Sequence, residues 1–205
     1  SDKLQLFTFA DDYSFGIIQS AAHCFWFATK AARLKNEEDF NYSSKSVFDT
    51  FPWPQKATVK QIEDVAAAAR RLRLVRAAAL EKMKGGLRAL YRTLELPGAN
   101  PLRDAHAALD TAVLAAYGFS AKKDLLAQLF ALNQHVAAKI EKGETVTAPG
   151  VPKHYHAGWE LVTEDCITPH DMPQPQPPDD STAQSAADAA HYYAIKEESP
   201  PYRTK

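Results

Sequence analysis

An alanine-rich stretch from Thr58 to Gly143 sets the tightest limit on how this chain can fold. The strong helix formers Ala, Leu, Arg, Lys and Glu dominate it, and apolar side chains recur at helical spacing from Ile62 to Leu80. Helix stop signals interrupt the pattern at Gly85-Gly86, Pro97-Gly98 and Gly118. Short connections between amphipathic helices favour antiparallel packing, so we expect a bundle of three long helices and one shorter one.

The ends of these helices have recognisable signals. Thr58 and Gln61 match a capping box, and Asn100 followed by Pro101 is typical of a helix start. We therefore expect helices over about 58–84, 87–95, 101–117 and 122–141.

Residues 1–57 have a different pattern. Alternation over Leu4–Phe9 predicts a short strand, and an acidic or hydroxyl side chain between residues 11 and 14 can cap a helix expected from Ser14 to about Leu34. After a polar segment, Val47–Phe51 is expected to be extended until the prolines that follow end it. We expect this block to pack beside the bundle as a small α+β piece, which makes the chain mainly α.

Charge and proline content divide the rest of the chain. Residues 58–142 carry fourteen basic and eight acidic side chains, whereas residues 143–205 carry four and ten. A basic body with an acidic tail favours a polyanion partner for the body. We expect a helical domain over 58–143, an extended segment over 144–172 and a disordered acidic, Pro-rich tail over 173–205, because the tail has few large apolar side chains to bury.

Several classes of protein are excluded or disfavoured. No apolar stretch approaches the roughly 20 residues that span a bilayer, so we expect no membrane partner. The first residue is Ser, and we expect a piece of a longer protein. Cys24 and Cys166 lack metal-ligand spacing, which favours a reduced, cytoplasmic setting without a disulfide or zinc site.

Catalytic signatures are missing. The sequence contains no GxGxxG, GxxxxGK[ST], HExxH or GxSxG motif. We expect Cys24 to be a buried structural thiol, and His106 and Asp110, four residues apart on one helix face, to form a surface hydrogen bond and no metal site. Ser199-Pro200-Pro201-Tyr202 matches a base-holding motif of amino-methyltransferases, but no Rossmann-like strand precedes it, so we interpret the match as coincidence.

Two groups of polar side chains are candidates for DNA contacts. The segment Arg33–Lys45 mixes guanidinium, amide, carboxylate, hydroxyl and ammonium groups, which can read base edges and bind phosphates; the alternative is a solvated loop. Basic side chains along the first long helix can contact phosphates or can simply form a solvated helix exterior: Arg70, Arg71, Arg73, Arg76, Lys82 and Lys84.

A family resemblance rests on the order of several motifs. It is carried by Tyr13-Ser14-Phe15-Gly16-Ile17-Ile18-Gln19-Ser20, His23, Trp26, Tyr42-Ser43 and Val47-Phe48-Asp49-Thr50-Phe51-Pro52-Trp53-Pro54. These residues resemble the closing part of the target recognition domain in MmeI-like, type IIL restriction-modification enzymes. Further motifs resemble that family's C-terminal helical region and ending: Leu90–Leu94, Asn100–Asp110, Ala116–Phe119 and Val162–Ile167. Other type IIG enzymes and adenine methyltransferases share a looser version.

The resemblance implies a DNA-recognition role inside a larger enzyme. That enzyme would methylate adenine in double-stranded DNA with S-adenosylmethionine and, in many members, cut DNA with Mg²⁺, through methyltransferase and nuclease domains that precede this chain. Base readers in the family lie in the target recognition domain, which makes the candidate DNA contacts Arg33, Lys35, Asn36, Asn41, Tyr42, Ser43 and Lys45. By contrast, we expect anchoring roles for Gly16, Phe51, Pro52 and Trp53, and helix packing or capping for Arg103-Asp104-Ala105-His106.

Two functions therefore stay open. The chain is either a DNA-specificity module or a helical lid or protein-interaction domain of the same enzyme that does not touch DNA. We expect no catalytic residue, cofactor or metal within these residues, and we disfavour an independent enzyme.

Overall fold

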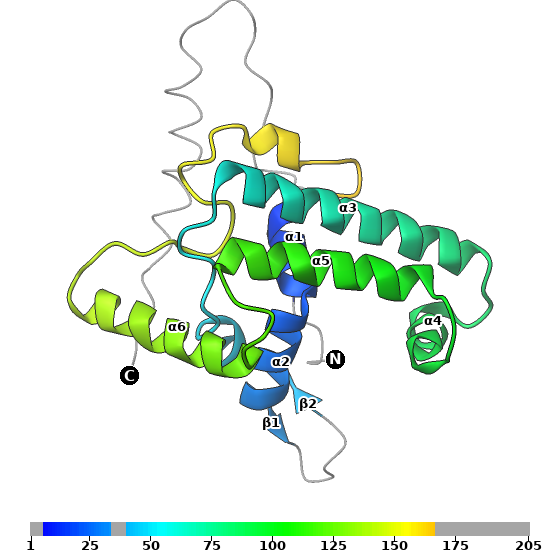
Figure 1. Cartoon of the computed structure of the whole chain (residues 1–205), viewed down its shortest axis with the longest axis horizontal. Coiled ribbons are helices and arrows are strands. Elements are labelled where there is room, and N and C mark those ends of the chain that lie inside the picture. Colours follow the sequence, from blue (N-terminus) through cyan, green and yellow to red (C-terminus); the bar gives the residue numbers. More distant parts are fainter. Residues whose placement is uncertain (1–5, 34–39, 167–205) are drawn as a thin grey trace, which may run out of the picture.

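The computed structural model describes residues 6–33 and 40–166. Within these ranges the fold is mainly helical (Figure 1). The α-helices are α1 (Asp12–Gln19), α2 (Ala21–Lys30), α3 (Val59–Glu81), α4 (Gly86–Arg92), α5 (Pro101–Tyr117) and α6 (Leu125–Glu141). A π-helical turn spans Ser44–Phe48, two 3₁₀ turns span Thr93–Glu95 and Gly158–Leu161, and two short strands, β1 (Ala32–Arg33) and β2 (Phe40–Asn41), pair antiparallel.

The helix signals in the second block act as predicted. The Thr58 side chain accepts a hydrogen bond from the Gln61 amide, and the Gln61 side chain accepts one from the Thr58 amide. Asn100 caps α5, which ends at Gly118 in the left-handed conformation that glycine adopts without strain. The expected three long helices and one shorter helix are confirmed to within a few residues. Each of these signals acts within a few residues of the helix end that it sets.

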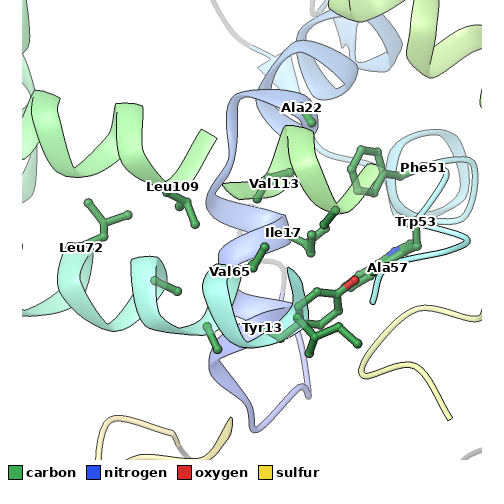
Figure 2. Packing of buried hydrophobic residues seen from close by; sticks show 14 of the residues in the cluster. Tyr13, Ile17, Ala22, Phe51, Trp53, Ala57, Val65, Leu72, Leu109 and Val113 are labelled. Carbon is green, nitrogen blue, oxygen red and sulfur yellow. The ribbon is translucent and has the colours of Figure 1, made fainter. Parts of the chain in front are cut away.

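The hydrophobic core forms where α1 crosses the antiparallel pair α3 and α5 (Figure 1). Figure 2 shows Ile17 of α1 close to Val65 of α3 and Val113 of α5. Tyr13, Leu72 and Leu109 belong to the same buried cluster. At Gly16 the three helices come so close that a β-carbon would lie 2.9 Å from Val65 Cγ1. The core thus extends across residue 57, and residues 12–19 are part of it.

The fourth helix of the expected bundle lies elsewhere. α6 packs on α2, to one side of the α3–α5 pair (Figure 1). Phe130 of α6 contacts the Trp26 ring of α2 at a centroid distance of 5.1 Å, and Asn133 donates to the Thr50 carbonyl oxygen at 2.7 Å. Residues 12–30 therefore connect the two halves of the helical region.

The helix expected from Ser14 to about Leu34 is in fact two helices that break at Ser20. Ser20 has an extended backbone (ψ 160°), and its hydroxyl donates to the Ile17 carbonyl oxygen at 2.7 Å. Across the core, Asp110 Oδ1 accepts a hydrogen bond from the Ala21 amide at 2.7 Å. Asp110 thereby satisfies an amide that the start of α2 leaves open, a partner that lies 89 positions away in the sequence.

Two expected extended segments are also wrong. Of Leu4–Phe9, the described residues 6–9 form no strand, and their rings pack on neighbouring aromatic side chains instead. Val47 belongs to the π-helical turn, where Thr50 donates to the Ser46 carbonyl oxygen at 2.7 Å. In both segments, ring packing and local hydrogen bonds take the place of a sheet ladder.

Residues 144–166 run back across the α1–α3 face. Asp12, which is fully buried, accepts hydrogen bonds from Arg70 Nε at 2.8 Å and from the Thr163 hydroxyl at 3.1 Å. Its other carboxylate oxygen forms an ion pair with Arg73 Nη1 at 2.8 Å. Arg70 also donates to the Glu160 carbonyl oxygen. One buried carboxylate thus joins α1, α3 and the C-terminal segment. The tail expected to be disordered, residues 173–205, lies outside the described residues.

Candidate functional site

The strand pair β1–β2 carries the ends of the candidate recognition segment. Ala32 pairs with Asn41 and Arg33 with Phe40, so the backbones of the two candidates Arg33 and Asn41 lie on neighbouring strands. Lys35 and Asn36 lie outside the described residues. The pair lies at one end of the molecule, beyond α2 (Figure 1).

Tyr42 fixes the base of this strand pair. Its ring stacks on Phe27 of α2 at 5.4 Å, and its hydroxyl lies 2.9 Å from His23 Nε2. Phe7 meets the Tyr42 ring edge-on at 5.7 Å. These contacts make Tyr42 an anchor of the β1–β2 strand pair, which we call the hairpin. Ser43 beside it is likewise half-buried.

His23 is held neutral under this anchor. Burial is the main cause that lowers the His23 pKa from 6.5 to about 4, and a backbone hydrogen bond with Ile18 opposes the shift. Burial likewise raises the Tyr42 pKa to about 12. Both groups are therefore uncharged at neutral pH, as a hydrogen bond inside an aromatic cluster requires. The sequence alone indicates only a polar residue on an apolar helix, because the partner Tyr42 lies 19 positions away.

The π-helical turn that follows carries Lys45, whose side chain is exposed. A hydrogen bond from α2 holds the turn in place, because Trp26 Nε1 donates to the Val47 carbonyl oxygen at 3.1 Å. The structure describes the side chains of three candidate DNA contacts, Tyr42, Ser43 and Lys45. Of these three, Lys45 is the exposed one.

The segment Phe51-Pro52-Trp53-Pro54 anchors the same region. All four residues are buried, and Tyr117 of α5 donates a hydrogen bond to the Pro52 carbonyl oxygen at 2.8 Å. The Phe51 ring meets His23 edge-on at 5.0 Å. The anchoring role expected for Phe51, Pro52 and Trp53 is confirmed.

A groove of about 630 Å³ separates the hairpin base from α4. Helices α1 to α5 all contribute to its lining, which includes His23, Cys24, Tyr42, Leu87, Tyr91 and His106. Cys24 is exposed here, so the expectation of a buried thiol is wrong. The side chain faces away from the core because Ala22, His23 and Trp26 occupy the buried face of α2.

The expected hydrogen bond between His106 and Asp110 does not form among the described residues, and each side chain has another partner. His106 Nε2 lies 3.2 Å from the Tyr91 hydroxyl of α4, while Asp110 accepts the Ala21 amide. Burial lowers the His106 pKa and raises the Asp110 pKa. The two side chains therefore join α5 to two different helices.

Arg103 has the capping role predicted for its motif. Its guanidinium donates to the carbonyl oxygens of Leu94, Leu96 and Gly98, at 2.6, 2.7 and 2.9 Å, and so closes the turn after α4. In residues 6–33 and 40–166 no group of three His, Cys, Asp or Glu side chains is placed to bind a metal ion. Within the same residues, no helix is both long enough and apolar enough to cross a bilayer.

Three of the six basic candidates on and beyond α3 have structural partners. Arg70 and Arg73 bind Asp12, and Arg76 Nη1 donates to Gln19 Oε1 at 3.2 Å. The Arg73 guanidinium also lies over the Phe15 ring at 3.9 Å. The remaining three are exposed: Arg71, Lys82 and Lys84.

Comparisons with known proteins agree with the resemblance seen in the sequence. Residues 1–55 match the family model "MmeI, target recognition domain". A solved structure of the type IIL restriction-modification enzyme MmeI in complex with DNA is similar, with 30% sequence identity and a TM-score of 0.54. The similarity covers 63% of this chain and 17% of that chain, so this chain corresponds to a small part of the relative. No curated protein matched the sequence.

Proposed function

We propose that this chain is the DNA-recognition portion of a restriction-modification enzyme, with the hairpin as its base-reading element. The observation that carries the proposal is that the family match spans residues 1–55, which include the hairpin and the anchors that hold its base. The similar solved enzyme was determined in complex with DNA. Anchored backbone on both sides of a polar segment is suited to holding base-reading side chains in position.

The proposal assigns the chemistry to other parts of the enzyme. Methyl transfer to adenine from S-adenosylmethionine, and cleavage with Mg²⁺, belong to methyltransferase and nuclease domains of the parent enzyme. The role of this chain is to orient double-stranded DNA for them. Arg33, Asn41 and Lys45 are the contacts that we propose from the described part of the hairpin region.

The test uses the intact parent enzyme and a library of randomised DNA sites. In Arg33→Ala or Asn41→Ala, loss of a base contact is expected to reduce discrimination by about 1–3 kcal/mol at one position of the site. In Lys45→Ala, loss of a phosphate contact is expected to weaken binding to all sequences alike and to lower the salt slope by about 0.9. Methylated products are sequenced, and binding is measured over a salt series.

Lys60→Ala is the matched control for Lys45→Ala. Lys60 is an exposed lysine in the first turn of α3, where its ammonium group pairs with Asp64. We expect it to leave both readouts unchanged. If the Arg33, Asn41 and Lys45 variants all retain the parent's site preference and salt slope, the alternative of a helical lid that does not touch DNA becomes the better account.

A further inference from the structure

The connection between α3 and α4 is strongly basic. Residues 82–92 contain four cationic side chains and no acidic one: Lys82, Lys84, Arg88 and Arg92. All four are exposed. We call these four residues the basic corner.

Side chains of the basic corner have no partner among the described residues. They take part in no ion pair, side-chain hydrogen bond or ring contact within residues 6–33 and 40–166. Arg70, Arg73 and Arg76, earlier on the same helix, are all bound by neighbouring side chains. The arginines of α3 that lie near α1 are therefore bound to neighbouring side chains, whereas the lysines after α3 and the arginines of α4 have no partner among the described residues.

Helix stability explains only part of this cluster. Cations near the C-terminus of a helix interact favourably with its dipole, which accounts for Lys82 after α3 and for Arg92 in the last turn of α4. Arg88 is the third residue of α4, where the dipole disfavours a cation. Because Arg88 and Arg92 are four positions apart, they share one face of α4.

The basic corner has a fixed position relative to the hairpin. Tyr91 of α4 meets His106 of α5, and Asp110, one turn or about 6 Å further along α5, holds the start of α2. The groove described above lies between them, with Leu87 and Tyr91 on one side and Phe27 and Tyr42 on the other. In Figure 1, α4 and the β1–β2 pair lie on the two sides of this region.

We propose that the basic corner is a second DNA contact, which binds the sugar-phosphate backbone without regard to sequence while the hairpin reads bases. The inference rests on the proposed function. A duplex carries one phosphate charge per about 1.7 Å of its axis, so a rigid body with two contact points across a groove is able to meet the same duplex twice. Such a contact supplies affinity and fixes orientation, and it adds no base preference.

The experiment compares three double variants of the intact parent enzyme: Lys82→Gln/Lys84→Gln, Arg88→Gln/Arg92→Gln and, as a control, Lys122→Gln/Lys123→Gln. The control pair is exposed and precedes α6, away from the groove lining. Glutamine keeps much of the side-chain length and removes the charge. Equilibrium binding to a duplex with the recognition site and to one without it is measured over a salt series, and methylated sites are sequenced.

Each basic-corner double variant is expected to lower the slope of log K against log salt by about 1.8, because each lost phosphate contact contributes about 0.9. Both duplexes should lose affinity by the same factor, and the methylated sequence should not change. The control should keep the parent's slope. Melting temperatures equal to the parent's would show that all three variants fold.

Three results would overturn the inference. They are a parental slope in both basic-corner variants, an equal loss in the control, or a change in the methylated sequence. If the hairpin variants change the site preference while the basic-corner variants behave as the parent, only this inference fails. If the parent enzyme does not bind DNA at all, the proposed function fails with it.

Discussion

Replacing Gly16 by alanine tests the close approach of α1 to α3 and α5. The added Cβ would lie 2.9 Å from Val65 Cγ1, 3.2 Å from Ala69 Cβ and 3.3 Å from Leu109 Cδ1. Overpacking of a buried site costs about 1–3 kcal/mol, whereas the better helix propensity of alanine returns at most about 1 kcal/mol. We expect Gly16→Ala to lower the free energy of unfolding by about 1–2 kcal/mol, measured by urea denaturation with circular dichroism.

A double-mutant cycle assigns this loss to its cause. Val65→Ala removes the closest methyl group, so the double variant should be more stable than the sum of the single effects predicts, by about 1 kcal/mol. Ala67→Gly, at an exposed position within α3, calibrates the propensity term and should cost about 1 kcal/mol. A Gly16→Ala protein at least as stable as the parent, or strictly additive effects, would refute the close approach.

Two further predictions concern buried polar groups. The His23 pKa is about 4 in the folded state and 6.5 in the unfolded state, so the unfolded state binds the proton first as the pH falls. The free energy of unfolding should therefore decrease between about pH 6.5 and pH 4, by up to about 3 kcal/mol. His23→Gln should flatten this part of the pH dependence, measured by urea denaturation at a series of pH values. Asp12→Asn should destabilise the chain by about 2–4 kcal/mol in the same assay, because Arg70 and Arg73 lose their anionic partner; stability equal to the parent's would mean that these ion pairs contribute nothing.

Local signals in the sequence were sufficient for the helices of residues 58–143. Thr58 with Gln61, Asn100 with Pro101, and Gly118 each act through hydrogen bonds or backbone angles within a few residues, so their effect can be predicted without knowing the fold. The anchoring role of Phe51, Pro52 and Trp53 was also predicted, from the family resemblance.

Other features depend on partners that are distant in the sequence. The break at Ser20 is stabilised by Asp110, 89 positions from Ala21, and the hairpin base depends on the contact between His23 and Tyr42. The crossing of α1 decides which arginines of α3 are bound, because it places Asp12 beside Arg70 and Arg73.

The sequence by itself therefore determined where the helices of residues 58–143 begin and end, because capping and stop signals act over one turn. Only the tertiary structure decided that α1 lies inside the core, that α6 packs on α2, and that the cations of residues 82–92 find no partner within residues 6–33 and 40–166. These outcomes follow from which surfaces meet when the helices pack, and a periodic pattern of apolar residues specifies that a face is buried without specifying its partner.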